Sequence, residues 1–533
     1  MSPLARLAHW LALAAALLLL NMTLTVASVW PTLGVRPTAR LSLETVLLAA
    51  AFALWSAAGR RISRRVLAVI AAVWVVLALS HYLEITSRAL YGRSVNLYWD
   101  LKLLPDVGAM FAFVAQPRML AAVVAGAILL PLTLYAVLRW AVGRVARASA
   151  DPRMGRALAT MSALAVAAGA ATLVNAGADG LFVRPAAAVL AGEAWEFAHE
   201  ASGAGRRPLP PAPDVSNDLS RVEGADVILL FIESYGATSW DRPEYASVLA
   251  PARHRLNEAI DASGRGVVTG LVESTTFGGE SWLAHISLLS GTEVRDADVN
   301  RRLMAEHRDT LVTPFARHGY RTMAVMPGLQ APWPEGRFYG FDRIYGLPDL
   351  GYEGPPFGWW DVTDQFVIAR MDALAVAPRD RAPVFVFMPS ISTHAPFTPV
   401  PPYQPDWSRV LTSAPYDEGP LTRAYAEVPD WTDLGPGYAR ALSYTYDTLA
   451  GYLRLRADRD LVLVIVGDHQ PAALVSGEGA SWEVPVHVVA SRPAVLERLR
   501  AHGFTEGLAP ARPDLARMDT LMPILLDAFG DPR

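Results

Sequence analysis

The chain has 533 residues, of which 52% are hydrophobic and only 18% are charged, so part of it is expected to lie in lipid. It contains no cysteine, which excludes disulfides, thiolate catalysis and cysteine-ligated metals. The formal net charge of -4 provides no basic footprint for a phosphate backbone, so no nucleic-acid partner is predicted.

The first third of the chain contains apolar runs long enough to cross about 30 Å of hydrocarbon. Five spans are predicted, near residues 7–28, 41–58, 65–84, 119–139 and 156–176; the second is short and the fifth is rich in alanine. Arginine clusters after the second and fourth spans indicate that these two loops are cytoplasmic. Residues 1–177 are therefore expected to form a transmembrane domain that leaves the rest of the chain outside the cytoplasm.

Two segments around this domain have their own composition. Residues 85–118 form an outer loop whose aromatic and leucine side chains suit short helices at the membrane interface, although an ordinary ordered loop explains them equally well. Residues 178–223 are expected to contain a juxtamembrane amphipathic helix and a proline-rich linker. Residues 224–533 are expected to form the extracytoplasmic catalytic domain.

The third segment alternates apolar runs with helix-like stretches. The runs are ADVILLFIES, GYRTMAVMP, APVFVFMPS, DLVLVIVGDH and VPVHVVA, and each is typical of a strand that is buried on both faces. Strands that alternate with helices predict an α/β domain with a mainly parallel central sheet.

Polar residues follow three of these runs. Glu233 follows the first, His394 lies just beyond the third, and Asp468 with His469 follows the fourth. Ligands of open α/β sheets bind beyond the carboxyl ends of the strands, and carboxylates with imidazoles suit one divalent ion such as zinc, manganese or magnesium. Taken singly, Glu233 and His394 could equally cap a helix or a turn, whereas two adjacent charged groups at the end of a buried strand favour ligation.

The order FIES, GGESWLAHISLLSG, STHAPF and VGDHQP resembles the alkaline-phosphatase/sulfatase superfamily. With five spans before the catalytic domain, the chain looks like the membrane-anchored phosphoglycerol and phosphoethanolamine transferases, which include lipoteichoic acid synthase and the periplasmic glucan phosphoglycerol transferase. The resemblance implies metal ligation by Glu233, Asp468 and His469, and it implies that His394 contacts the phosphoryl group or the leaving oxygen. It also implies a bacterial inner-membrane protein with a periplasmic catalytic domain.

The nucleophile of this family lies ten positions before the glycine of a small LLTG-like turn, which here gives Ser281. The resemblance implies that the Ser281 oxygen also binds the metal. Glycines before Ser281 allow a tight approach, and a helix that begins there directs free N–H groups at an anion. Ser281 could also simply cap the helix, and Thr276 is the reserve nucleophile. His285, four positions later, is expected to be structural.

Phosphoglycerol transferases bind the head group after the strand that corresponds to TMAVMP, and by resemblance Trp333 and Arg337 would serve here, although no histidine is present. The missing disulfides favour this branch over lipid A phosphoethanolamine transferases. The sequence thus indicates metal-dependent transfer of a phosphoglycerol-type head group from a membrane phospholipid to a glycan or lipid acceptor through a phosphoserine. The alternatives are phosphoethanolamine transfer, a phosphodiesterase or sulfatase-like hydrolase, and a lipid-binding pseudoenzyme.

Overall fold

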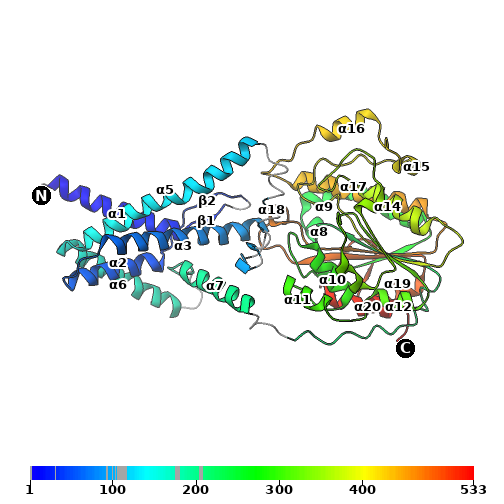
Figure 1. The fold of residues 1–533 in the computed structure, drawn as a ribbon, viewed down its shortest axis with the longest axis horizontal. Coiled ribbons are helices and arrows are strands. Elements are labelled where there is room, and N and C mark those ends of the chain that lie inside the picture. Colours follow the sequence, from blue (N-terminus) through cyan, green and yellow to red (C-terminus); the bar gives the residue numbers. More distant parts are fainter. Residues whose placement is uncertain are drawn as a thin grey trace. The chain divides into compact units, whose positions relative to one another are not determined.

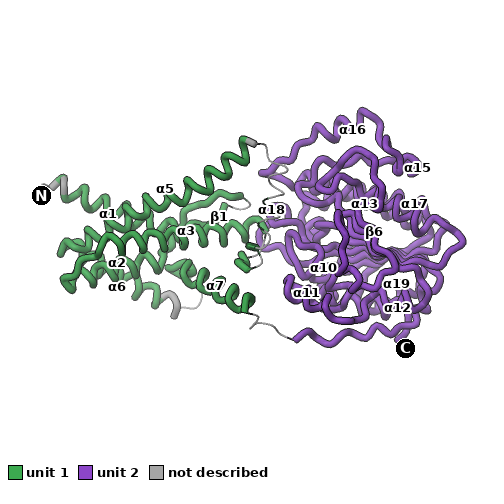
Figure 2. The backbone as a smooth tube through the Cα atoms, in the orientation of Figure 1, with its two compact units in different colours: residues 1–207 green, residues 208–533 purple. Residues whose placement is uncertain are grey.

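The computed structural model describes residues 3–29, 32–91, 94–98, 100–101, 104, 108, 117–174, 180–202 and 208–532. The chain divides into two compact units, residues 1–207 and residues 208–533, which Figure 2 shows in different colours.

The first unit is almost entirely helical (Figure 1). Its described helices are α1 (Pro3–Thr25), α2 (Leu43–Ala57), α3 (Arg64–Tyr91), α5 (Pro117–Ser149), α6 (Pro152–Val174) and α7 (Ala186–Ser202). The two-residue strands β1 (Ala27–Ser28) and β2 (Val35–Arg36) pair antiparallel. Leucine and alanine side chains of α1, α2, α3 and α5 form a shared core.

Four helices in the described part of this unit are long and apolar enough to cross a membrane: α1, α3, α5 and α6. The 15 residues of α2 are also apolar, but they extend only about 22 Å, which is less than the thickness of the hydrocarbon core. The five predicted spans are therefore present as four long helices and one short helix.

The predicted interfacial loop over residues 85–118 was wrong at both ends. Helix α3 continues to Tyr91 and α5 already begins at Pro117, and most of the residues between them lie outside the described ranges. A hydrogen bond between residues four positions apart stabilises the extension of α3: Arg88 Nε donates to Glu84 Oε1 at 2.7 Å. Helix α5 also runs past the predicted end at 139, so Arg139 and Arg147 lie on the helix rather than in a loop.

The second unit is an α/β domain. Its strands are β3 (Asp226–Ile232), β4 (Gly266–Glu273), β5 (Arg321–Met326), β6 (Arg343–Gly346), β7 (Val384–Pro389), β8 (Leu461–Gly467), β9 (Glu483–Ala490), β10 (Thr505–Glu506) and β11 (Ala516–Arg517). The longer helices are α9 (Pro243–Ala262), α10 (Ser281–Ser290), α11 (Ala297–Met304), α14 (Asp364–Met371), α16 (Glu418–Tyr425), α17 (Gly435–Leu455), α19 (Pro493–Ala501) and α20 (Leu521–Phe529). The short helices are α8 (Thr238–Asp241), α12 (Val312–Arg317), α13 (Leu347–Leu350), α15 (Trp407–Val410), α18 (Ala473–Ser476), the 3₁₀ helices Pro334–Tyr339 and Met518–Thr520, and the π-helix Asp372–Val376.

The strands form one sheet in the order β10-β4-β9-β8-β3-β7-β5-β6, with β11 beside β4. The pairs β8–β3, β3–β7, β7–β5 and β5–β6 are parallel, whereas β9 runs antiparallel to both β8 and β4. This arrangement confirms the predicted mainly parallel sheet. Strands β3 and β8 lie at its centre.

Helices cover both faces of the sheet (Figure 1). On β3, Ile228, Leu230 and Ile232 face a core that includes α9, α14 and α17. The alternate residues Val227, Leu229 and Phe231 face a core that includes α10, α19 and α20. Burial on both faces explains why these strands read as continuous apolar runs.

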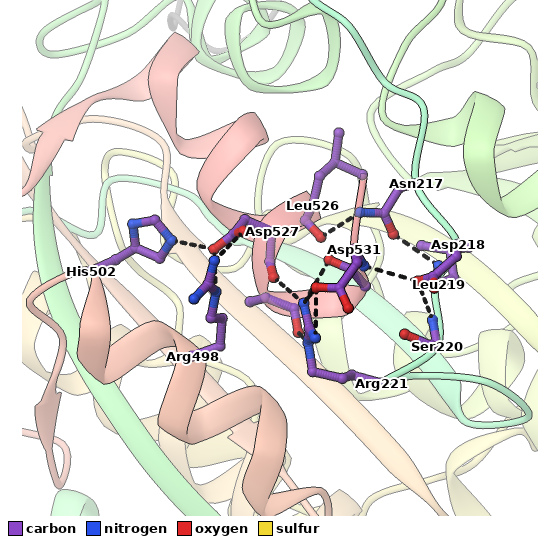
Figure 3. A network of polar contacts seen from close by, with 12 residues as sticks. Asn217, Asp218, Leu219, Ser220, Arg221, Arg498, His502, Leu526, Asp527 and Asp531 are labelled. Carbon is purple, nitrogen blue, oxygen red and sulfur yellow. Dashed lines mark hydrogen bonds and ion pairs between the residues drawn. The ribbon is translucent and has the colours of Figure 1, made fainter. Parts of the chain in front are cut away.

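The segment that enters the second unit is fastened to the C-terminal helix (Figure 3). The side-chain amide of Asn217 donates to the carbonyl of Leu526 at 2.9 Å. The Arg221 guanidinium donates to three further carbonyls at the end of α20, those of Asp527, Ala528 and Gly530. These contacts are here called the C-terminal clasp. The Arg221 bonds supply donors to carbonyls at the helix end, whereas the Leu526 carbonyl also accepts the N–H of Gly530.

Candidate active site

Two neighbouring strands deliver the acidic side chains. The parallel strands β3 and β8 pair in register up to Ile232 opposite Gly467, so Glu233 and Asp468 follow at the same edge of the sheet. A Cβ atom at position 467 would lie only 1.9 Å from the carbonyl oxygen of Tyr235, so this close approach requires glycine. Both carboxylates are buried, Glu233 at 7% and Asp468 at 1% exposure.

Backbone hydrogen bonds fix the Asp468 carboxylate. Its Oδ1 accepts the N–H of Ser234 at 2.8 Å and that of His469 at 2.6 Å. Ser234, which has a φ of 56°, also donates its hydroxyl to Glu233 Oε1 at 3.2 Å. Each strand end therefore holds the side chain of the other.

The turn that precedes α10 is built on the same edge. Gly278 donates its N–H to the carbonyl of Gln470 at 3.1 Å, and Ser274 donates its hydroxyl to the carbonyl of Asp468 at 2.5 Å. Gly279 has a φ of 150°, which disfavours any residue with a Cβ. Because Glu280 is also left-handed, the chain reverses sharply and the helix begins at Ser281, as predicted.

Ser281 meets the acidic pair directly. Its Oγ donates to Glu233 Oε2 at 2.7 Å and lies 3.2 Å from His469 Nε2. His469 Nε2 is in turn 3.3 Å from Glu233 Oε1. The structure thus brings the predicted nucleophile together with three side chains whose ligand atoms all lie within 4.8 Å of one another.

Electrostatics distinguishes this cluster from an ordinary ion pair. Burial and the neighbouring Glu233 charge raise the pKa of Asp468 well above its usual value. Burial alone would lower the pKa of His469, but the charges of Asp468 and Glu233 raise it to about 9. Burial likewise opposes ionisation of Glu233, yet the charge and hydrogen bond of His469 lower its pKa overall. The two carboxylates are thus matched by one cationic group.

The cluster fits a divalent metal ion. His469 Nδ1 donates to the carbonyl of Gln470 at 2.7 Å, which leaves Nε2 directed at the carboxylates. Two carboxylates, one imidazole nitrogen and a serine oxygen are a donor set that zinc, manganese or magnesium accepts. A bound cation would take the place of the proton on His469 and of the Ser281 hydrogen bond.

His394 lies at the edge of the cluster. Its charge lowers the pKa of Glu233, although less than that of His469 does. The half-buried ring packs edge-on against Trp360 at 4.9 Å, and its Nδ1 donates to the carbonyl of Ala395 at 2.7 Å. Nε2 is therefore the nitrogen that can exchange a proton with a substrate.

The other expected site residues are placed differently. The hydroxyl of Thr276 donates to the carbonyl of Gly279 at 2.6 Å and so closes the turn. Trp333 packs against Tyr339 with ring centroids 5.5 Å apart, whereas Arg337, on the 3₁₀ helix Pro334–Tyr339, is exposed. His285 packs against Phe231 with ring centroids 4.6 Å apart.

The role of Asp364 was not predicted. Its buried carboxylate accepts the N–H groups of Ile391 at 2.7 Å and of Ser392 at 3.1 Å, and it thereby fixes the turn that leads to His394. A Thr-Asp pair before a helix looks like an ordinary cap, and Thr363 does cap α14. Only the fold shows that the next residue supports the site.

The second unit and the whole chain are similar to known proteins. Residues 227–488 match the family model named Sulfatase. No curated protein gives a significant match. The fold is similar to that of lipooligosaccharide phosphoethanolamine transferase A from Neisseria meningitidis, with 14% identity, a TM-score of 0.45 and coverage of 91% of this chain and 87% of that one.

Two further solved structures are similar to a part of this chain. The lipoteichoic acid synthase LtaP from Listeria monocytogenes has 14% identity and a TM-score of 0.39 and covers 61% of this chain and 78% of its own. The phosphoglycerol transferase GacH from Streptococcus pyogenes has 14% identity and a TM-score of 0.35, with coverage of 57% and 75%. The match over residues 227–488 confirms the predicted resemblance of the second unit to the alkaline-phosphatase/sulfatase superfamily.

Proposed function

We propose that the protein is a membrane-anchored, metal-dependent phosphotransferase of the bacterial inner membrane. It moves a phosphoglycerol-type head group from a membrane phospholipid to an extracytoplasmic glycan or lipid acceptor. The observation that carries the proposal is the Ser281 hydroxyl, which lies at a helix N-terminus within hydrogen-bond distance of both Glu233 and His469. An anion at this position would meet free N–H groups and a nucleophile together.

In this proposal some residues of the chain bind the metal and another transfers the proton. Glu233, Asp468 and His469 would hold one divalent ion, whose charge lowers the pKa of the serine hydroxyl and stabilises phosphoryl oxygens. Ser281 Oγ releases its proton to solvent and forms a bond to phosphorus while the bond from phosphorus to the diacylglycerol oxygen breaks. His394 gives that leaving oxygen its proton, because its Nε2 is not used in the bond to Ala395.

The second half of the reaction reverses these roles. A hydroxyl of the acceptor attacks phosphorus and passes its proton to His394, and the bond from phosphorus to Ser281 Oγ breaks. Ser281 then recovers a proton, and the head group has moved to the acceptor. The apolar helices of the first unit would keep the enzyme on the membrane that contains the donor.

The test is mass spectrometry of the full-length protein after incubation with phosphatidylglycerol and a divalent metal. We expect the mass of one phosphoglyceryl group on the peptide that contains Ser281, and a phosphoethanolamine increment would identify the other head group. The Ser281→Ala variant should lose transfer by about 10³-fold or more, because it lacks the nucleophile.

The matched control is Ser290→Ala on the same helix, whose hydroxyl only donates to the carbonyl of Ile286 at 2.6 Å. This variant should retain the adduct and the activity. Full transfer by Ser281→Ala, or an adduct on Thr276, would overturn the assignment of the nucleophile.

A further inference from the structure

A cavity of about 430 Å³ lies in the second unit next to α10. Its wall includes Trp282, Leu289, Met304, Leu329 and Phe387. Helices α10 and α11, strands β5 and β7, and the segment 328–341 contribute the wall, so the cavity lies between the helical layer and the sheet. Its size is within the range of pockets that bind small ligands.

The wall is mostly apolar. Its polar side-chain atoms are those of His285, Asn300 and Glu335, the Tyr339 hydroxyl and the indole N–H groups of Trp282 and Trp333, and no arginine or lysine is among the lining residues. A glycerol or ethanolamine group buried here would exchange several hydrogen bonds with water for a wall with few partners. Arg337, which the sequence suggested for the head group, does not line the cavity.

His285 provides one unused polar atom within this wall. The side chain is only 8% exposed, and its buried Nε2 has no hydrogen-bond partner among the described residues. Burial lowers the pKa of His285 to about 3, so the ring is neutral and attracts no anion. Its ring also packs against Phe387, with centroids 5.5 Å apart. A ligand that is apolar apart from one hydrogen-bonding group would complement this surface.

The cavity is adjacent to the nucleophile in sequence and in space. Trp282 belongs to its wall and directly follows Ser281, whose hydroxyl meets the acidic cluster. We propose that the cavity binds a hydrocarbon moiety of a substrate whose phosphorus is at Ser281, with His285 Nε2 as its single hydrogen-bonding contact. The proposal rests on the phosphotransferase function and adds a specificity-determining pocket to it.

The hydrocarbon has two possible sources, an acyl chain of the phospholipid donor or the apolar chain of a lipid acceptor. Either would gain roughly fourfold in affinity for each methylene that leaves water. Photolabelling of the full-length Ser281→Ala protein in lipid nanodiscs distinguishes the two sources. One arm uses phosphatidylglycerol with a diazirine in an acyl chain, the second an isoprenyl lipid with a diazirine, and the third a phospholipid with a diazirine on the head group.

We expect one of the two chain-labelled probes to modify residues between 297 and 341, and its identity reveals the source. The cavity-filling variants Met304→Trp and Leu329→Trp should each reduce this labelling at least tenfold. The control Val248→Trp places the same side chain on an exposed position of α9 and should not change it. Two filling variants are used because one of them could fail to fold, which thermal unfolding would reveal.

Labelling of the cavity only by the head-group probe, by no probe, or equally in the filling variants would overturn the proposal. The Ser281 adduct is measured on the wild-type protein in parallel. An intact adduct with an unlabelled cavity contradicts the pocket alone, whereas a labelled cavity without an adduct contradicts the phosphotransferase function alone.

Discussion

The two ends of strand β3 each bury a carboxylate, but they surround it differently. Asp226, at the first residue, receives both Arg381 nitrogens, at 2.7 and 2.6 Å, and the N–H of Val384 at 3.2 Å. Glu233, just beyond the last residue, faces Asp468 instead, and no arginine of the described ranges forms an ion pair with either of these two acids. One strand thus carries a completed ion pair at one end and an acidic cluster at the other.

This difference shows how a structural carboxylate is distinguished from a functional one. Burial of a charge is costly unless a partner compensates it, and at Asp226 the fold itself supplies that partner. At Glu233 and Asp468 it supplies one histidine for two acids, so a cation from outside would complete the set. The comparison can be tested by changing each end separately.

The largest loss of activity is expected from changes at the end of β3 that carries Glu233. Glu233→Gln and Asp468→Asn should each abolish stoichiometric metal binding and lower transfer by about 10³-fold, a loss typical of removing charge stabilisation in a transition state. The metal-free Asp468→Asn protein should be at least as stable as the metal-free wild type, because burial and the Glu233 charge disfavour the Asp468 carboxylate. Metal analysis, a transfer assay and urea unfolding measure these outcomes. Retention of one metal per chain by both variants would contradict the site.

The opposite end should respond in stability rather than in chemistry. Arg381→Ala leaves Asp226 buried without its partner and should lower the free energy of unfolding by about 3–5 kcal/mol. Metal content and activity of the folded fraction should not change. The control Arg379→Ala removes an exposed pair with Asp458 and should cost less than about 1 kcal/mol. Equal costs for the two arginines would remove the distinction between the two ends.

Chelation should remove only the stabilisation that the metal provides at Glu233 and Asp468. At a metal concentration 100 times its Kd, the bound ion stabilises the folded state by about 2.7 kcal/mol, which EDTA should remove together with transfer activity. Asp468→Asn should show no such shift in unfolding, while Arg381→Ala should show all of it. A wild-type unfolding curve that EDTA leaves unchanged would argue against a resident metal.

A smaller effect is expected at Asp364, a buried carboxylate held by backbone N–H groups. Burial raises its pKa to about 6, although the N–H groups of Ile391 and Ser392 oppose the shift. Its proton therefore stabilises the fold fully below about pH 4, and this contribution is lost as the pH rises through about 6. Asp364→Asn should remove that part of the pH dependence and should cost about 1–3 kcal/mol above pH 6, because one N–H acceptor is lost.

Urea unfolding at pH 4, 5, 6 and 7, followed by tryptophan fluorescence, measures this difference between wild type and variant. Activity should also fall, since Asp364 fixes the turn that carries His394. A constant difference in unfolding free energy across this pH range would show that Asp364 does not titrate there.

The strands of the parallel core could be predicted because burial on both faces leaves continuous apolar runs such as DVILLFI. The direction of β9 could not, since VPVHVVA is equally apolar in either direction and only its pairing with β4 and β8 sets it. Strand β4 was missed because Thr269 and Gly270 interrupt its apolar pattern. Thr269 is nevertheless buried, with its hydroxyl donating to the carbonyl of Gly507 at 2.6 Å.

The cluster of Glu233, Asp468 and His469 could be predicted because its members follow the ends of β3 and β8, and strand register then brings them together. The support of the turn before His394 joins Asp364 to Ser392, 28 positions apart, and leaves no local pattern. The cavity beside α10 was likewise invisible, because Leu289, Met304 and Phe387 look like ordinary core residues until the space between them is seen. Empty volume is a property of packing rather than of any one residue type.

The C-terminal clasp has a mechanical consequence. Residues 208–222 lie within the segment expected to be a linker, yet Asn217 and Arg221 fasten them to α20. A pull transmitted along the chain from the first unit therefore reaches the last helix before it reaches β3, which begins at Asp226. The clasp would therefore spread such a load over the core that α20 shares with α10 and α19.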